Sequence, residues 1–363
     1  MVIGRNSVSM SLDSSFREHS QEPAVVASAG KRKEEQLGAS SLYAFRSPAM
    51  GTEFTLHLYA SSQNAAYCTA RDAFEEVHRI ERLLSHYRPD SELSRISREA
   101  FDHEVTTDPE TFGFLESAFG WSELSGGAFD ITVGRLMKAW GFFGDSGRVP
   151  TEQEISSLRG QMGWRYVRLN PDRRTVRFLA PGIELDPGGI GKGYAVDRMV
   201  RVLEDEAVTA ALISAGSSTL YAVAAPPGEP GWKVHVPAPG RPEQILSTVY
   251  LRDTSLSTAS YTEKRFSVGE RVYGSIMSPE TLAPVESVAQ VTAVAPTATD
   301  SDALSNVLFV LSGPARTALL ESLLEVSALV MTAGEGTALP EATRWPAPIV
   351  TEEGSLSLRI EGD

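Results

Sequence analysis

Residues 184–194, ELDPGGIGKGY, combine carboxylates, four glycines and a lysine in one short stretch. An apolar run precedes Asp186 and a helical pattern follows over residues 194–206, so the order predicts a strand, a tight loop and the start of a helix. Glycine lets the backbone approach a ligand closely and adopt positive φ, while the first helical N–H groups and Lys192 favour an anion. The loop therefore predicts a site for a phosphate-bearing ligand.

The two standard nucleotide-binding motifs do not fit this loop. A P-loop has a glycine five residues before its Gly-Lys pair and a serine or threonine after the lysine, where this chain has Asp186 and Gly193. The dinucleotide fingerprint G-x-G-x-x-G needs a glycine at the position of Tyr194. Glycine-rich turns between strands and helices also occur without a ligand. A phosphate site here would therefore belong to another fold.

Polar residues in three other stretches are candidates for ligand contacts. Tyr87 lies on a bend before Pro89, which breaks the preceding helix, and its ring either stacks on a flat ligand or packs against the protein. Asp130 lies in a glycine-bounded loop and either binds a ligand or caps a turn. Asp302 and Asn306 are four positions apart at a helix start, so their oxygens share one face. That pair suits Mg²⁺ with phosphate oxygens, or ordinary helix capping.

The composition limits the class of protein. With 363 residues, 42% of them hydrophobic, the chain can bury a large core in one or two domains. The net charge of −14 argues against non-specific binding to nucleic acid or to an anionic membrane, because both need a basic surface. A small anionic ligand in a local pocket stays compatible with this charge. The single Cys68 excludes internal disulfides and thiolate-only metal clusters.

The N-terminal residues 1–41 are rich in Ser, Arg, Lys and Glu and lack periodicity, which predicts a disordered tail. They contain no apolar core of a secretory signal. No run of about 18 apolar residues occurs in the chain, so we expect no transmembrane helix. These observations predict a cytoplasmic location.

Hydrophobic periodicity predicts a folded part in which strands and helices are interspersed. An alternating strand over residues 53–59 precedes an amphipathic helix over residues 66–84, and residues 166–179 form a hairpin. Helix starts are predicted at capping residues: Ser62 or Asn64, Asp90 or Ser91, Asp108, and Thr151 with Glu154. Further strands are predicted over residues 210–214, 220–223, 232–236, 245–251, 271–276 and 288–295.

Eight motifs follow one another along the chain: MGTEFTLHLY, SHYRPDSELSRIS, GGAFDITVGRLMKAWGFFG, ELDPGGIGKGYAVD, LISAGSS, LSTAS, YGSIMSPETLAPV and TATDSDALSNVLFVL. Their order and approximate spacing over residues 45–334 resemble the FAD:protein FMN transferase family (ApbE-like). The resemblance implies an α+β fold of the T-fold type, with antiparallel sheets and packed helices in a single domain over residues 42–350. A C-terminal tail, residues 351–363, would follow this domain.

The resemblance also implies an activity and a set of site residues. The family cleaves FAD in a cleft, releases AMP and attaches FMN to a Ser or Thr of a target protein, with Mg²⁺ on the pyrophosphate. Lys192 and the cation would then stabilise the transition state and the AMP leaving group. By motif position the FAD site would comprise Met50, Tyr87, Ala128, Phe129, Asp130, Asp186 and Lys192, with Tyr87 beside the flavin ring. The carbonyl of Gly189 and the side chains of Asp302 and Asn306 would hold the metal.

The chain departs from the family pattern at three places. The pattern His-Ile-hydrophobic-Asp-Pro-x-Thr-Gly reads SIMSPETL at residues 275–282, so Ser275 stands where the family has its expected general base. The same comparison places Ser278 and Leu282 where the family has Asp and Gly. The Asn-x-Gly-Gly-Asp stretch appears as SAGSS at residues 214–218, and the metal-binding threonine as Asn306.

The replaced histidine leaves two functions open. A serine cannot take a proton at neutral pH as imidazole does, and loss of a general base typically lowers the rate by about 10²–10⁴-fold. The sequence therefore predicts either a weakened FMN transferase or a non-catalytic FAD-binding protein, with His235 and Glu280 as candidate substitute bases. A scaffold without a ligand is disfavoured, because the expected FAD contacts Tyr87, Asp130, Asp186 and Lys192 are all present.

Overall fold

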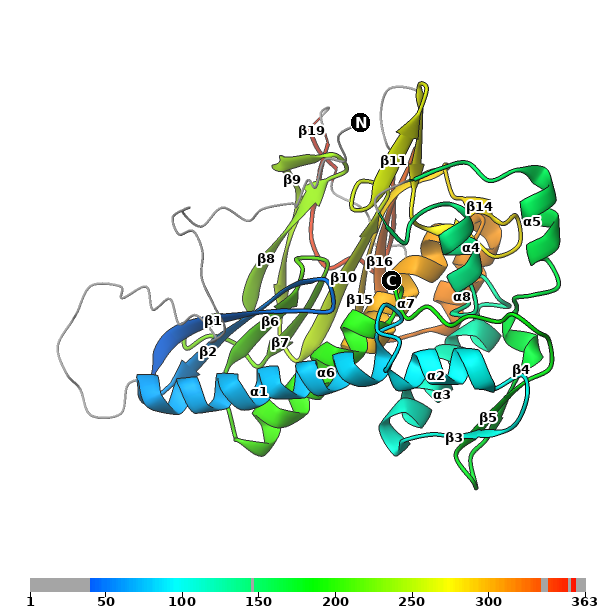
Figure 1. The fold of residues 1–363 in the computed structure, drawn as a ribbon. Helices are drawn as coiled ribbons and strands as arrows, with labels where there is room; N and C mark the ends of the chain where they lie inside the picture. Colours follow the sequence, from blue (N-terminus) through cyan, green and yellow to red (C-terminus); the bar gives the residue numbers. More distant parts are fainter. Residues whose placement is uncertain (1–39, 145–146, 334–338, 352–353, 357–363) are drawn as a thin grey trace.

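An eight-stranded antiparallel sheet forms the centre of the molecule (Figure 1). The computed structural model describes residues 40–144, 147–333, 339–351 and 354–356. In spatial order the strands are β1 (Ser41–Ala49), β2 (Thr52–Ala60), β6 (Ala211–Ala215), β7 (Thr219–Val223), β10 (Thr254–Ser260), β15 (Val288–Ala295), β16 (Ser327–Thr332) and β17 (Leu339–Thr343). The alternation of buried Phe54, Leu56 and Leu58 on β2 confirms the predicted strand with one buried face.

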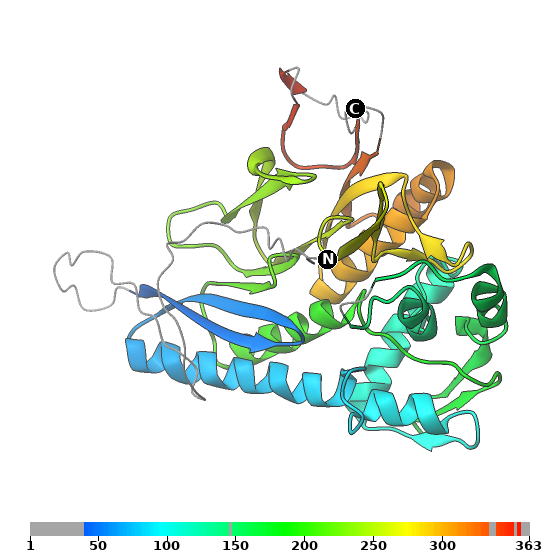
Figure 2. The ribbon, with the colours of Figure 1, turned by 45° about the horizontal axis from the view of Figure 1, so that its top comes forward.

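Three helices pack on one face of this sheet: α1 (Gln63–Leu84), α6 (Gly191–Asp205) and α7 (Ala298–Val310). α1 runs below the β1–β2 hairpin in both views, and α6 packs against α1 (Figure 1 and Figure 2). The apolar residues of α1 recur at helical spacing and are buried, which confirms the predicted amphipathic helix. Ser62 caps it, because its hydroxyl accepts the N–H of Ala65 at 3.2 Å.

A smaller sheet covers the opposite face. Its strands, in spatial order, are β19 (Gly354–Leu356), β18 (Ile349–Thr351), β9 (Arg241–Leu251) and β8 (Trp232–Ala238). Leu220, Leu256 and Leu329 of the large sheet pack against Trp232 and Val249 in a second apolar core. The large sheet is thus buried on both faces, which explains why β15 is buried along almost its whole length.

A lobe of short elements adjoins the C-terminal end of α1 (Figure 2). It contains α2 (Glu92–Glu99), α3 (Pro109–Leu124), α4 (Gly134–Ala139), α5 (Glu152–Leu158), a 3₁₀ turn (Trp164–Tyr166), and a sheet of β3 (Val105–Thr106), β5 (Thr175–Phe178) and β4 (Val167–Asn170). The predicted helix starts are confirmed: Ser91 caps α2, Asp108 caps α3, and Thr151 and Glu154 form the capping box of α5.

Two hairpins stand over this lobe: β11 (Arg265–Val268) with β12 (Arg271–Gly274), and β13 (Met277–Ser278) with β14 (Ala283–Pro284). They pack on α4 and α5 through a third apolar core that includes Trp140, Phe266 and Leu282. The indole N–H of Trp140 donates to the carbonyl of Leu282 at 3.0 Å. A further helix, α8 (Gly313–Ser322), follows α7.

Two predictions about the central loop are wrong. No strand precedes it: the only bridge near it is a parallel one between Val133 and Glu184, because the residues before the loop run beside the segment before α4 instead of joining a sheet. The following helix begins at Gly191, before the predicted residue 194. Strands β10, β11 and β16 were not predicted.

The predicted tails are described only at their inner ends. Residues 1–39 lie outside the described residues, and β1 begins at Ser41, the last residue assigned to the N-terminal tail. In the C-terminal tail, β19 pairs with β18, and residues 352–353 and 357–363 lie outside the described residues.

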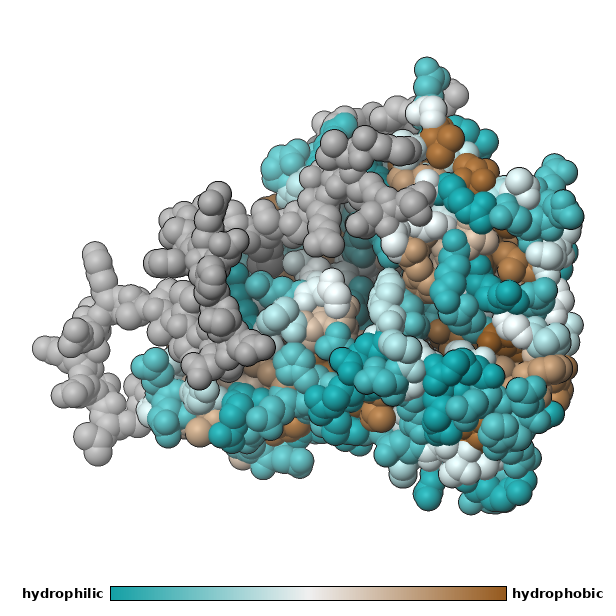
Figure 3. Space-filling view, in the orientation of Figure 1, coloured by the Kyte–Doolittle hydropathy of each residue, from teal (hydrophilic) through white to brown (hydrophobic). Residues whose placement is uncertain are grey.

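The surface shown in Figure 3 is mostly hydrophilic over α1 and α2. Exposed apolar residues occur on the β11–β12 hairpin, where Val268 and Val272 are exposed (Figure 3). In the described part of the chain, none of the helices combines the length and apolar character needed to cross a bilayer.

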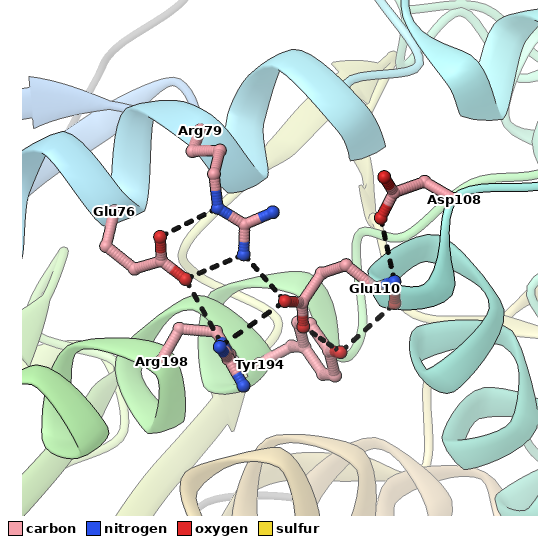
Figure 4. Close-up of polar contacts among 6 residues, drawn as sticks. All are labelled: Glu76, Arg79, Asp108, Glu110, Tyr194 and Arg198. Carbon is pink, nitrogen blue, oxygen red and sulfur yellow. Dashed lines mark hydrogen bonds and ion pairs between the residues drawn. The ribbon is translucent and has the colours of Figure 1, made fainter.

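A cluster of charged residues joins three helices below the sheet (Figure 4). Glu110 on α3 accepts hydrogen bonds from Arg79 on α1 at 2.6 Å and from the hydroxyl of Tyr194 on α6 at 2.5 Å. Glu76 accepts from Arg79 at 2.7 Å and from Arg198 at 3.2 Å, and these two guanidinium groups lower the pKa of Glu76. The cluster thus ties the first turns of α6 to α1 and α3.

We expect Glu110→Ala to lower the free energy of unfolding by about 2–4 kcal/mol, because it leaves the Tyr194 hydroxyl and one side of Arg79 without their largely buried carboxylate partner. Urea denaturation measures the change. Glu123→Ala is the matched control, since Glu123 is exposed on the same helix. Equal stability of the two variants would contradict the prediction.

Candidate active site

A cavity of about 560 Å³ opens where the end of α1, the central loop, the end of β10, the β11–β12 hairpin and α7 meet. This volume lies in the usual range for ligand pockets. All residues predicted from the sequence line it: Met50, Tyr87, Ala128, Phe129, Asp130, Asp186, Gly189, Lys192, Ser275, Asp302 and Asn306. The structure therefore brings together residues from six separate motifs of the chain.

Hydrogen bonds of Asp186 fix the conformation of the central loop, residues 186–192. The N–H of Asp186 donates to the carbonyl of Ile131 at 2.7 Å, and its carboxylate accepts the N–H of Gly188 at 2.8 Å. The carbonyl of Pro187 accepts the N–H of Gly191 at 2.8 Å, which closes the turn into α6. Asp186 is buried although it lines the cavity, so the loop carries its own internal anion.

The loop glycines are required by close packing and not by backbone conformation. Gly188, Gly189, Gly191 and Gly193 all have φ values outside the left-handed region, so the expected positive φ is wrong for this loop. A Cβ at Gly193 would overlap the carbonyl oxygen of Ala298 and lie 2.8 Å from the Cβ of Asp302. A Cβ at Gly189 would lie 3.0 Å from the ring of Phe129. Glycine therefore lets α6 and α7 approach each other.

The carboxylate of Asp302, a residue of α7, caps the N-terminus of α6. It accepts the N–H of Gly193 at 2.9 Å, so the anion at this helix N-terminus belongs to the protein itself. In return Asp197 on α6 accepts the N–H groups of Ala298 and Thr299 at 2.7 and 2.8 Å and caps α7. The two helix starts are thereby fixed to each other.

The charges of Lys192 and Asp302 are coupled. Burial raises the pKa of Asp302, and the Lys192 ammonium opposes this rise. Burial lowers the pKa of Lys192, but Asp302 and Glu263 outweigh it and the net pKa of Lys192 is raised. Lys192 is therefore a positive charge held at the floor of the cavity.

Asp130 and Met50 are fixed by backbone contacts. The two oxygens of Asp130 accept the N–H groups of Thr132 and Trp164, each at 2.8 Å, and burial raises its pKa. Asp130 thus caps a turn, which is one of the two predicted alternatives, and it also lines the cavity; ligand binding stays a prediction. Met50 begins the two-residue turn between β1 and β2 with φ 50°, and its N–H donates to Glu81 at 2.7 Å.

An aromatic group stands at one wall of the cavity. The ring of His86 lies 3.9 Å from that of Tyr87 and 4.5 Å from that of Phe143, measured between centroids. Tyr87 is 62% exposed, so one face of its ring is available to a flat ligand. His86 Nδ1 lies 3.5 Å from a carboxylate oxygen of Asp186, and burial lowers the pKa of His86 although Asp186 opposes this.

Ser275 lines the cavity next to the β11–β12 hairpin. It follows β12 directly, and its N–H donates to the carbonyl of Lys264 at 3.0 Å. Neither His235 nor Glu280 lines the cavity; His235 lies on β8, where its ring bonds Thr248. The structure therefore brings neither candidate substitute base into the lining of the cavity.

Two departures from the family pattern lie in strained backbone. Leu282 has φ 59° and Ser217 has φ 64°, both in the left-handed region that favours glycine. Leu282 is buried in the third apolar core with Trp140, so its side chain packing offsets the conformational cost. Ser217 is followed by Ser218, whose carbonyl accepts the N–H of Thr258 at 2.7 Å.

His86, Glu263 and Lys264 are among the cavity residues that sequence reasoning missed. His86 lies inside the motif that carries Tyr87, and Glu263 and Lys264 follow the LSTAS motif closely. Their positions within or next to the motifs are the sequence signal that points to these residues. The lining carboxylates are Glu81, Asp130, Asp186, Glu263 and Asp302, against the cations Arg88, Lys192 and Lys264.

The predicted metal ligands lie together. The amide nitrogen of Asn306 donates to the carbonyl of Gly189 at 3.2 Å, and Asp302 lies one helical turn before Asn306. A half-turn of the amide exchanges its nitrogen and oxygen, so a carbonyl, a carboxylate and an amide oxygen can face one point, a set that fits a hard cation. Among the described residues, no three His, Cys, Asp or Glu side chains gather in a way that could hold a metal.

Known proteins share this architecture. A FAD:protein FMN transferase of Treponema pallidum is 29% identical over 296 residues, 77% of this chain and 82% of the relative, and one of Salmonella typhimurium is 29% identical over 241 residues, 63% and 67%. The crystal structure of an ApbE protein of Thermotoga maritima matches with a TM-score of 0.76 and 29% identity over 84% of this chain and 97% of that one. A flavinyl transferase ApbE of Pseudomonas stutzeri, 24% identical, matches in fold with the same TM-score over 85% and 97%.

These likenesses confirm the predicted α+β class with antiparallel sheets and packed helices. The sequence model of the ApbE family matches residues 50–330. This range includes all eleven predicted site residues, with Met50 at its first position. Because this match spans well over half of the 363 residues, the chain belongs to the ApbE family.

Proposed function

We propose that the protein is a Mg²⁺-dependent FAD:protein FMN transferase, which moves FMN from FAD onto a Ser or Thr of a target protein and releases AMP. The observation that carries this proposal is that the eleven residues expected at an FAD and metal site all line one cavity. They come from distant parts of the chain, so their meeting is a property of the fold. Membership of the ApbE family and the names of the relatives support the same activity.

In this proposal the cavity walls have separate tasks. The exposed ring of Tyr87 stacks on the flavin, and Lys192 neutralises charge on the diphosphate and on the leaving AMP. The carbonyl of Gly189 and the side chains of Asp302 and Asn306 would hold Mg²⁺, which when bound supplies further charge neutralisation at the diphosphate. The chain itself contributes position and fixed charge, which are the main needs of phosphoryl transfer.

The charge of the cavity favours a divalent cation. Its five carboxylates exceed its three cationic side chains, and a diphosphate adds further negative charge. Like charges at close range repel by several kcal/mol at the low effective dielectric of a protein interior, so a cation beside Asp302 would offset this repulsion. This argument supports the magnesium requirement independently of the resemblance.

A second candidate, a non-catalytic FAD-binding protein, is supported by Ser275. The structure places this serine in the cavity at the position where the resemblance expects a general base. A serine has no basic site at neutral pH. The second candidate therefore keeps FAD binding and lacks transfer.

One experiment separates the two candidates. Purified protein is incubated with FAD, Mg²⁺ and a target domain that carries a flavinylation serine or threonine. Transfer gives a fluorescent target band after denaturing electrophoresis and one AMP released for each FMN attached. Bound flavin without AMP or a fluorescent band would overturn the transferase and favour the binding protein.

We expect Asp302→Asn to weaken FAD binding in the presence of Mg²⁺ by about 10–100-fold, because the amide can still accept the Gly193 N–H but lacks the charge for the cation. Flavin fluorescence titrations with Mg²⁺ and with EDTA measure the effect, and the two titrations should converge for the variant. Asp205→Asn is the control, since Asp205 is exposed at the far end of α6. An unchanged response to Mg²⁺ would refute the proposed metal site.

A further inference from the structure

We propose that Glu263 is the general base that activates the acceptor hydroxyl, in place of the histidine that is absent at position 275. This inference rests on the proposed FMN transfer and names the catalytic group that the transfer would otherwise lack. It follows from where the fold puts the Glu263 carboxylate relative to Ser275, Lys192 and Asp302.

Backbone pairing puts Glu263 beside Ser275. In the β11–β12 hairpin Arg265 is paired with Gly274, and the next contact outward is the N–H of Ser275 donating to the carbonyl of Lys264 at 3.0 Å. Glu263 therefore comes one residue beyond the position opposite Ser275. The regular ladder ends at Arg265 and Gly274, so the strict alternation of side chains ends there too. Both residues line the cavity.

The carboxylate of Glu263 is available for chemistry. Glu263 as a whole residue is exposed and lines the cavity, so a second molecule that enters the cavity can approach it. Among the described residues no hydrogen bond or salt bridge holds its carboxylate; its one recorded bond runs from its backbone N–H to the carbonyl of Ser260. The other cavity carboxylates all accept backbone N–H groups, which Glu263 does not in the described part of the chain: Glu81, Asp130, Asp186 and Asp302.

The charges of Lys192 and Asp302 act on the same carboxylate. Protein atoms around it and the charge of Asp302 raise the pKa of Glu263, while Lys192 lowers it. Glu263 thus interacts with the two residues proposed for the diphosphate and its cation, and it lies next to the position of the missing base. His86 is a weaker candidate, because its ring nitrogens are buried and its ring packs on those of Tyr87 and Phe143.

The proposed step balances without any additional reactant. The acceptor oxygen forms a bond to the phosphorus of FMN, its proton passes to the Glu263 carboxylate, and the phosphoanhydride bond to AMP breaks. AMP leaves with the bonding electron pair, and the protonated Glu263 returns its proton to water. A carboxylate accepts the proton of a substrate hydroxyl in the same way in protein kinases.

Glu263→Gln tests the proposal by removing the base at nearly unchanged size. We expect transfer at saturating FAD and Mg²⁺ to fall by about 100-fold or more, with the Kd for FAD within about threefold of the unmodified protein. Glu270→Gln, at the exposed tip of the same hairpin, is the matched control and should transfer normally. In the double variant with Ser275→His, imidazole at the family position should restore transfer at least tenfold over Glu263→Gln alone.

Several results would overturn the inference. If Glu263→Gln retained transfer within threefold, Glu263 would not be the base. A loss of FAD binding in proportion to the rate would make Glu263 a binding residue, and recovery at higher Mg²⁺ would make it a metal residue. If only His86→Gln lost transfer, the general base would be His86 and not Glu263. If the unmodified protein binds FAD but releases no AMP, the proposed function fails and this inference fails with it, a result visible before any variant is made.

Discussion

Gly193→Ala is expected to lower the free energy of unfolding by about 3 kcal/mol or more and to weaken FAD binding sharply. The added methyl group would overlap the carbonyl oxygen of Ala298 and crowd the Cβ of Asp302. Neither atom can rotate away, because the first is a backbone atom and the second is bonded directly to the backbone. α6 and α7 must then separate, which displaces Lys192 from Asp302. Urea denaturation and flavin titration measure the two effects.

Gly120→Ala is the matched control for this change. Gly120 lies exposed in α3, and a Cβ there would meet nothing within 4 Å. Alanine should therefore stabilise the helix by up to about 1 kcal/mol. A Gly193→Ala protein that is as stable as the Gly120→Ala protein would show that α6 and α7 tolerate a wider spacing.

Lys192→Met is expected to lower the rate of FMN transfer by about 10²–10³-fold, the usual cost of losing one preorganised charge at a transition state. Methionine keeps most of the apolar stem, so the loss reports on the ammonium. The pKa of Asp302 should rise further, because Lys192 is the cation that now lowers it. Single-turnover AMP release gives the rate, and flavin titration gives the Kd for FAD.

Lys233→Met, on the exposed side of β8, controls for the loss of a lysine elsewhere. If Lys192→Met transfers within tenfold of the unmodified protein at saturating FAD, Lys192 has no part in stabilising the leaving AMP. A change in Kd alone would assign it to ground-state binding.

The local features of the fold followed from the sequence because short-range interactions determine them. The apolar spacing of α1 and the caps at Ser62, Ser91, Asp108 and Thr151 depend on residues within one or two turns. The strand expected before the central loop failed for the opposite reason. Its apolar residues satisfy their burial beside the segment before α4, and periodicity cannot show which partner a buried segment meets.

The sequence by itself determined the family, the helix caps and the list of residues for the cavity, since motifs and local patterns carry that information. Only the tertiary structure decided how the central loop works. Its glycines permit the contact of α6 with α7, and the acceptor at the Gly193 N–H is Asp302, 109 positions away. The place of Glu263 beside Ser275 likewise depends on a hairpin pairing, and such long-range contacts follow from packing of the whole chain.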